Sequence, residues 1–254
     1  RTEANGRYSL AAGYETVCEN LRSAAIGYQA AVLNEGYSCI ALGHQARVDA
    51  DRVSGYAIGN NVFADGAYTT AFGTNASTDS AYGSFVWGDF STTDTVRPPT
   101  KAKHQFIARS AGGVVFYSDS ASSMGVQVAA GGGAWTTISD RRKKENFALV
   151  NKEEILIIIE ELPVYYWNYK SQDDGVVHLG PMAQDFFNAF GLGLSDTTIT
   201  TTDIDGVVMV GIQAVNERLD HVEESSNSLD ADASKDLEQD YNDMNGRMDA
   251  LEEQ

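Results

Sequence analysis

Residues 24–30 read Ala-Ala-Ile-Gly-Tyr-Gln-Ala, and variants of this short phrase recur through the first 90 residues. Each copy places an apolar segment before a glycine, and successive glycines are 14 to 16 residues apart. These glycines are Gly13, Gly27, Gly43, Gly59, Gly73 and Gly88. A strand and a glycine turn repeated at one period are typical of a β-solenoid, in which each coil buries its apolar face on the next. Glycine suits such turns because a tight corner needs positive φ or a close approach of two backbones.

The small size of each coil also bears on assembly. A coil of 14 to 16 residues encloses a very small core, which favours three chains packed together over a solenoid made by one chain. Residues 10–90 resemble the head repeats of trimeric autotransporter adhesins, a β-roll that phage fibres also contain. The resemblance implies an intertwined homotrimer, with a monomeric solenoid as the structural alternative. Exposed Tyr, Asn and Gln at the corners could contact a host receptor or glycan, but such residues are usually structural, so we assign no binding residue.

Composition and charge exclude several classes of partner. The chain has 254 residues and a formal net charge of −18. This charge argues against nucleic acid and anionic membranes, because phosphate contacts need clustered Lys and Arg. No run of 18 apolar residues is present, so we expect no membrane insertion. Cys18 and Cys39 are too few, and too poor in nearby histidines, for a zinc site. We expect two small buried thiols, with a disulfide as the less favoured alternative, and no metal or cofactor.

A basic run marks a sharp change in the chain. Residues 137–146 read Thr-Ile-Ser-Asp-Arg-Arg-Lys-Lys-Glu-Asn, between a Gly-, Ala- and Thr-rich region and a region of helical patterns. A lysine that is held neutral can act as the general base for a serine hydroxyl, and neighbouring cations and desolvation both favour the neutral form of a lysine. Ser139 and Lys144 therefore have the residue types of a Ser/Lys dyad. Their spacing alone is a weak pattern, and a solvated basic turn is the plainer interpretation.

The residues around this run add a specific resemblance. Four ordered blocks carry it: residues 139–146, Leu162-Pro-Val-Tyr-Tyr-Trp-Asn-Tyr-Lys170, His178-Leu-Gly-Pro-Met-Ala-Gln-Asp-Phe186 and Asp205-Gly-Val-Val-Met-Val-Gly-Ile-Gln213. From Ser139 to about Leu219 the chain resembles the C-terminal intramolecular chaperone of phage tail fibres and tailspikes. This is the endosialidase-type self-cleaving domain, peptidase family S74.

The resemblance implies roles for individual residues. It makes Ser139 the nucleophile, Lys144 the base and the peptide bond between Ile138 and Ser139 the scissile bond. Lys143 stands where family members often carry an apolar residue, so Lys143 is a second candidate for the base. His178 is the family's motif histidine and could line the cleft as a supporting residue, although a lone histidine is usually structural.

The spacing of the dyad constrains how it can form. An offset of five places two side chains on opposite faces of a strand, and about 140° apart on a helix. Neither regular element brings Ser139 to Lys144, so the dyad must form across a tight turn or between subunits. We therefore expect cleavage to wait for correct trimer assembly. Interwound chains with many non-local contacts fold slowly, and removal of the chaperone afterwards would leave a kinetically trapped fibre.

The patterns divide the chain into four parts. We expect adhesin-head-like β-roll repeats over 1–92, a β-rich connector over 93–138, the self-cleaving chaperone domain over 139–219 and an acidic coiled-coil tail over 220–254. The predicted fold class is thus a mainly β N-terminal half, a trimeric β-roll or β-solenoid with its connector, followed by an α+β domain and a C-terminal α-helical coiled coil.

The C-terminal half contains the helical patterns. We expect a buried helix over 152–162, a strand over 164–169 and a turn followed by a helix over 178–190. From residue 207 onward apolar residues follow helical spacing, but small and polar residues such as Ser226 interrupt the 4-3 rhythm. The trimeric coiled coil should therefore be marginal, and stable only while the rest of the molecule holds it together.

These expectations combine into one function. The chain should be the distal part of a phage or phage-tail-like fibre for host-surface attachment, in the virion tail fibre or an extracellular tail-like particle, and made in the host cytoplasm. Its enzymatic activity should be a single autocatalytic cut by a Ser/Lys endopeptidase. The alternative is a purely structural trimeric adhesin whose C-terminal domain is a permanent, non-cleaving clamp. A glycan-cleaving tailspike is disfavoured, because no convincing pair of cleft carboxylates is present.

Overall fold

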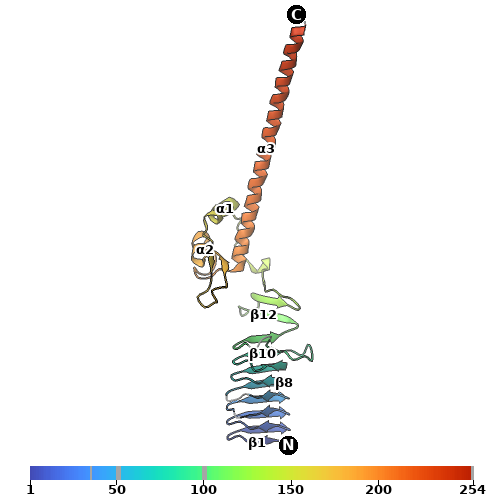
Figure 1. Cartoon of the computed structure of the whole chain (residues 1–254), viewed down its shortest axis with the longest axis vertical. Coiled ribbons are helices and arrows are strands. Elements are labelled where there is room, and N and C mark those ends of the chain that lie inside the picture. The colour runs from blue at the N-terminus through green and yellow to red at the C-terminus, as the bar shows by residue number, and fades with distance from the viewer. Residues whose placement is uncertain (35, 50–52, 99–101, 253–254) are drawn as a thin grey trace. The chain divides into compact units, whose positions relative to one another are not determined.

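The computed structural model describes residues 1–34, 36–49, 53–98 and 102–252. The chain forms two compact units, Arg1–Glu145 and Asn146–Gln254, and Figure 1 shows that strands fill the first and helices dominate the second. The predicted fold class, a β-solenoid in the N-terminal half followed by a small α+β region and a long helix, is confirmed.

The first unit is built on one 11-stranded parallel sheet that winds as a solenoid. Its longer strands are β2 (Leu10–Tyr14), β4 (Ala24–Tyr28), β6 (Ile40–His44), β8 (Tyr56–Ala64), β9 (Thr70–Ser77), β10 (Phe85–Gly88) and β11 (Phe106–Arg109). Its short strands are β1 (Glu3–Ala4), β3 (Val17–Cys18), β5 (Ala31–Val32) and β7 (Arg47–Val48). Equivalent positions of successive coils pair directly, so the repeat in the sequence becomes the ladder in space (Figure 1).

The solenoid core consists of small side chains, as its short coils require. Ala25, Ala41, Ala57 and Ala71 stack in register and are fully buried. They belong to one cluster with Val32 and Val48 and with the thiols of Cys18 and Cys39, both of which are free and buried. Burial raises the pKa of the Cys18 thiol, so this cysteine is a small apolar core residue.

The recurring glycines stack on one another inside the strands. Gly27, Gly43 and Gly59 pair in register with φ of +137°, +130° and +138°. A Cβ at Gly43 would collide with the carbonyl oxygen of Gly59, which is close-packed in the next coil. These glycines thus have both the positive φ and the close backbone contact that were predicted, but they lie within strands and do not form the corners. The corner follows two residues later, at polar residues with left-handed φ such as Gln29 (53°) and Gln45 (54°).

The connector contributes to two different sheets. Its strand β11 pairs with β10 and adds the last rung to the solenoid. After a turn, β12 (Gly113–Tyr117), β13 (Gly125–Ala129) and β14 (Thr136–Thr137) form a three-stranded antiparallel sheet. A single-turn 3-10 helix, Arg141–Lys143, follows and ends the first unit.

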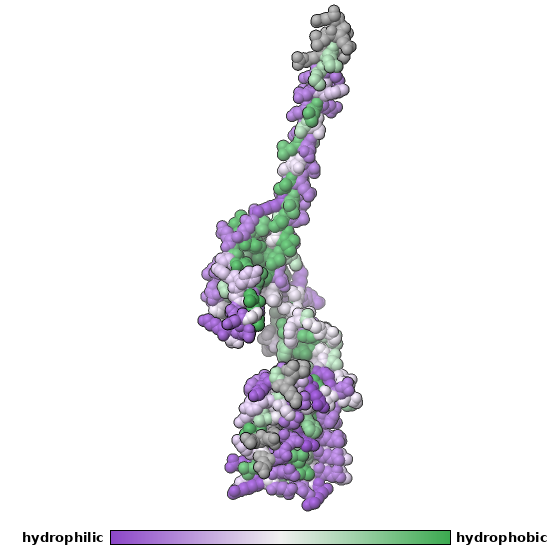
Figure 2. Space-filling model, viewed as in Figure 1, coloured by the Kyte–Doolittle hydropathy of each residue, from purple (hydrophilic) through white to green (hydrophobic). Residues whose placement is uncertain are grey.

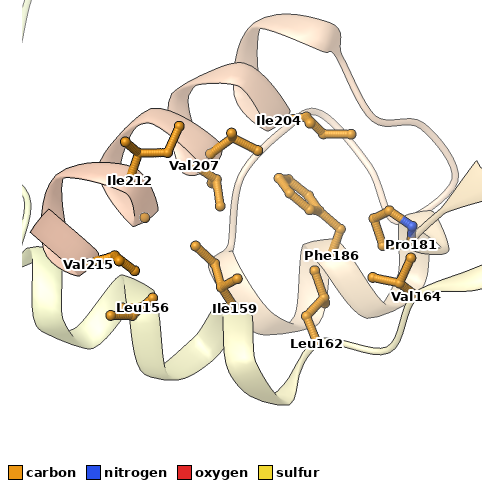
Figure 3. Close-up of a pocket in the computed structure, with 12 residues that line it drawn as sticks. Leu156, Ile159, Leu162, Val164, Pro181, Phe186, Ile204, Val207, Ile212 and Val215 are labelled. Carbon is orange, nitrogen blue, oxygen red and sulfur yellow. The ribbon is translucent and has the colours of Figure 1, made fainter.

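The second unit packs three helices around an apolar cavity. Its elements are α1 (Lys152–Glu161), β15 (Tyr165–Trp167), β16 (His178–Gly180), α2 (Ala183–Phe190) and α3 (Thr201–Glu252). A pocket of about 470 Å³ is lined by Leu156 and Ile159 of α1, Phe186 of α2 and Val207 of α3, and Figure 3 shows these side chains around it. On the solvent side, the Arg218 guanidinium joins α3 to α1 through Glu153 (2.6 Å) and Glu160 (3.0 Å). The helices and the strand expected at 152–190 therefore form near the predicted positions, but the turn expected at residue 178 is wrong. Residues 178–180 form strand β16, because they pair with β15.

Helix α3 is 52 residues long and continues without a break through residues 219 and 220. Beyond its first turns it exposes most of its apolar side chains, and Figure 2 shows hydrophobic residues over α1 and the base of α3 and at intervals along it. The last two residues of the expected tail, 253 and 254, lie outside the described residues. Across the part of the chain that the structure covers, no helix combines the length and apolar character that a membrane span needs.

Candidate active site

The basic run folds into a tight turn because Asp140 caps it. The Asp140 carboxylate accepts a hydrogen bond from the backbone N–H of Arg142 (2.9 Å) and pairs with the Arg142 guanidinium (2.8 Å). The Arg142 side chain, and then its backbone N–H, hold the pKa of Asp140 below its usual value. The backbone N–H groups of Lys143 and Lys144 donate to the carbonyls of Asp140 (3.0 Å) and Arg141 (3.2 Å). These bonds close a single 3-10 turn over Arg141–Lys143.

This turn brings Ser139 and Lys144 into contact. The Lys144 Nζ lies 2.6 Å from the Ser139 Oγ, and both side chains are exposed in the single chain. Of the two routes that the five-residue offset left open, the structure contains the tight turn within one chain. A neutral Nζ at this distance is within reach to accept the hydroxyl proton, which is the geometric requirement for a general base.

The residue before Ser139 is held by the connector sheet. The backbone N–H of Ile138 donates to the carbonyl of Gly125 (3.2 Å), one step beyond the β13–β14 pairing of Val126 with Thr137. Ile138 is half-buried. The chain therefore leaves the sheet directly at the Ile138–Ser139 peptide bond, with the carbonyl side attached to the sheet and the serine on the turn.

The two neighbouring lysines contact different oxygens. While Lys144 reaches Ser139, the Lys143 ammonium donates to the backbone carbonyl of Ser123 at 2.7 Å. Ser123 lies in the loop between β12 and β13. Their adjacent positions in the sequence leave either lysine as a candidate base, whereas the folded chain places only Lys144 against the serine hydroxyl.

His178 lies in the second unit, in an aromatic cluster of the β15–β16 hairpin. Its ring centroid is 4.6 Å from that of Trp167 and 5.8 Å from that of Tyr169. Its Nε2 lies 3.0 Å from the Oε1 of Gln172, and the indole N–H of Trp167 is buried without a hydrogen-bond partner. These contacts hold the imidazole within its own hairpin, so a supporting role for His178 stays a prediction.

Three residues that hold the site were not identified from the sequence: Asp140, Ser123 and Gly125. Asp140 could have been found, because an aspartate just before a short helical turn is a common N-cap. Ser123 and Gly125 could not, because nothing in the sequence relates them to residues 13 or more positions later. Only the pairing of β13 with β14 places them beside the turn.

Comparisons with known proteins agree with the position of this turn. Residues 139–191 match the family model Peptidase_S74, described as the chaperone of endosialidase. Neither a curated protein nor a solved structure matches the chain. The match ends before α3, so the resemblance of residues 205–213 to the same family, and that of residues 10–90 to adhesin heads, stay predictions. The part of the chain that begins at Ser139 is thus similar to the chaperone of endosialidase, with Ser139 as the first matched residue.

Proposed function

We propose that this chain is the distal part of a trimeric, phage-type fibre whose C-terminal segment guides assembly and then removes itself by cutting the Ile138–Ser139 bond. One observation carries the proposal: the Lys144 Nζ lies 2.6 Å from the Ser139 Oγ at the first residue that matches the endosialidase chaperone. A basic turn that was only solvated would not require its last lysine, Lys144, to contact the hydroxyl of Ser139 five residues earlier.

The proposed reaction proceeds through an ester. The Ser139 Oγ attacks the carbonyl carbon of Ile138 while the neutral Lys144 Nζ takes the hydroxyl proton. The peptide C–N bond then breaks, the nitrogen of Ser139 takes a proton to become a free amine, and an ester joins Ile138 to the Ser139 oxygen. Water hydrolyses this ester, which yields a carboxylate at Ile138 and restores the hydroxyl at Ser139. The cut occurs once in each chain.

Exposed apolar side chains support the trimer. On α3, Leu219 is 56% exposed and Val222 is 64% exposed in the single chain, and they fall on the helical spacing that a coiled coil buries. On the solenoid, equivalent positions of four successive coils carry Ile26, Leu42, Ile58 and Phe72. All are exposed except Ile58, which is half-buried. A long apolar stripe of this kind marks an interaction surface, and further copies of the chain would cover it.

Attachment to a host surface is the second part of the proposal. A thin parallel solenoid with a self-removing assembly segment suits a fibre that must survive outside a cell, because unfolding is slow once its assembly template has left. The virion tail fibre, or an equivalent tail-like particle, is the proposed location.

Denaturing electrophoresis and intact mass measurement of the purified chain test the proposal. The wild-type chain should yield two fragments, the second beginning at Ser139, whereas Ser139→Ala should remain full length. The control is Ser171→Ala, which removes a different, exposed hydroxyl. An assembled wild-type chain that stays intact on prolonged incubation would instead favour the permanent, non-cleaving clamp.

A further inference from the structure

A three-residue segment of the connector contacts the chain on both sides of the proposed scissile bond. The carbonyl of Gly125 accepts the N–H of Ile138 (3.2 Å), and the carbonyl of Ser123 accepts the Lys143 ammonium (2.7 Å). The Ile138 contact lies just before the proposed scissile bond, and the Lys143 contact lies four residues after Ser139. The two fragments that cleavage would produce are therefore both bonded to residues 123–125.

An ionised aspartate holds this segment rigid. The Asp119 carboxylate accepts hydrogen bonds from the backbone N–H of Ser123 (2.8 Å), the hydroxyl of Ser123 (2.7 Å) and the backbone N–H of Met124 (2.9 Å). The Met124 N–H, with the two Ser123 donors, lowers the pKa of Asp119 to about 2. Ser118 closes the loop by donating its N–H to the carbonyl of Met124 (2.9 Å). The Ser123 carbonyl is thus presented in one direction.

A contact from outside the basic run fixes the 3-10 turn relative to the sheet. None of the three residues of the turn is buried, and its cap Asp140 belongs to the same run, whereas the Lys143 ammonium bonds to a residue of the connector. Ile138 is fixed to the sheet, but attack also requires Ser139 to be fixed relative to the Ile138 carbonyl. In the first unit the Lys143–Ser123 contact ties the turn to the same sheet segment that holds Ile138.

We propose that Lys143 is a positioning residue for self-cleavage, tied to the connector through the Ser123 carbonyl that Asp119 presents. This inference rests on the proposed function. Lys143 anchors the turn, Lys144 remains beside the hydroxyl, and the connector that stays with the fibre forms part of the apparatus that releases the chaperone. This role gives Lys143 a function of its own, distinct from that of the proposed base Lys144 next to it.

Arginine separates an anchor from a base at this position. An arginine donates hydrogen bonds to a carbonyl but does not lose its proton in proteins. If Lys143 anchors the turn, Lys143→Arg should retain most of the wild-type cleavage rate, and Lys143→Met should be about 10- to 100-fold slower, as a small misplacement of a reacting group is. Lys144→Arg should be inactive. Lys103→Met, at an exposed lysine of the same unit, is the matched control for lost charge.

A second arm tests the route through Asp119. Asp119→Ala should slow cleavage about as much as Lys143→Met, and the double variant should be no slower than the slower single variant, because both act through one contact. The pH dependence of the rate should keep its midpoint in Lys143→Arg, which retains the positive charge next to Lys144. Thermal unfolding of cleavage-blocked Ser139→Ala versions would show that each variant is folded.

The outcomes distinguish this inference from the function on which it rests. An uncleaved wild-type chain would defeat the proposed function itself. If the wild-type chain cleaves, three results would overturn only the anchoring role of Lys143. They are a Lys143→Met variant as fast as wild type, an inactive Lys143→Arg variant, and a double variant whose loss of rate is the product of the two single losses.

Discussion

The contact between Ser139 and Lys144 within one chain predicts that the dyad acts in cis. The perturbation is a mixed assembly, in which Ser139→Ala chains and Lys144→Ala chains are unfolded together and refolded in equal amounts. No chain then carries both groups, although each mixed trimer holds an intact serine on one chain and an intact lysine on another.

The expected size of the effect follows from the lost contact. The Lys144 Nζ lies 2.6 Å from its own Ser139 Oγ, and general-base assistance contributes about 100- to 10,000-fold to a rate. Lys144→Ala chains should therefore be slower by roughly this factor. Co-assembly with Ser139→Ala chains should leave them equally slow, because the other lysine belongs to a turn on its own connector sheet.

The assay is the first-order rate of fragment formation, followed by denaturing electrophoresis with the two chains distinguished by a mass tag. A mixture of wild-type and Ser139→Ala chains is the control, and its wild-type chains should cut at their usual rate. Recovery of cleavage in the Lys144→Ala chains of the mixed assembly would refute the argument, since it would require a lysine from another subunit.

Three further outcomes are expected. Gly43→Ala should destabilise the solenoid by about 1–3 kcal/mol through its backbone conformation, because φ is +130° at this position. The collision of the added Cβ with the next coil should increase this loss. Thermal unfolding should show no such loss for Gly112→Ala, where a Cβ would have no atom within 4 Å. Leu219→Asp with Val222→Asp should give monomers in light scattering, because each side chain forfeits about 1.5–3 kcal/mol of burial and adds charge repulsion; unchanged trimers would contradict the proposed seam. The pKa of Asp119 is lowered from 3.8 to about 2, so its ionised carboxylate should stabilise the folded chain above pH 4. This stabilisation should be lost as the pH falls toward 2. Acid unfolding of Asp119→Asn should lack this pH-dependent loss.

Much of this molecule could be predicted from local patterns. A period of 14 to 16 residues with one glycine per coil predicts a parallel solenoid, because identical coils can bury their apolar faces only on one another. The apolar run before Pro163 predicted helix α1, and the helical spacing after residue 207 predicted a long helix. The residue types of the proposed dyad were also visible, because Ser139 and Lys144 lie five positions apart in one short run.

The roles of individual residues within these elements needed the tertiary structure. The sequence suggested that the glycines form the corners, whereas close contact between coils puts Gly43 inside a strand and leaves the corner to Gln45. The sequence also left Lys143 and Lys144 as alternatives, because adjacent residues have the same local chemistry. What separates them is the position of the Ser123 carbonyl, 20 residues earlier in the chain. That position depends on the pairing of β13 with β12 and β14, a non-local contact that no spacing within the basic run encodes.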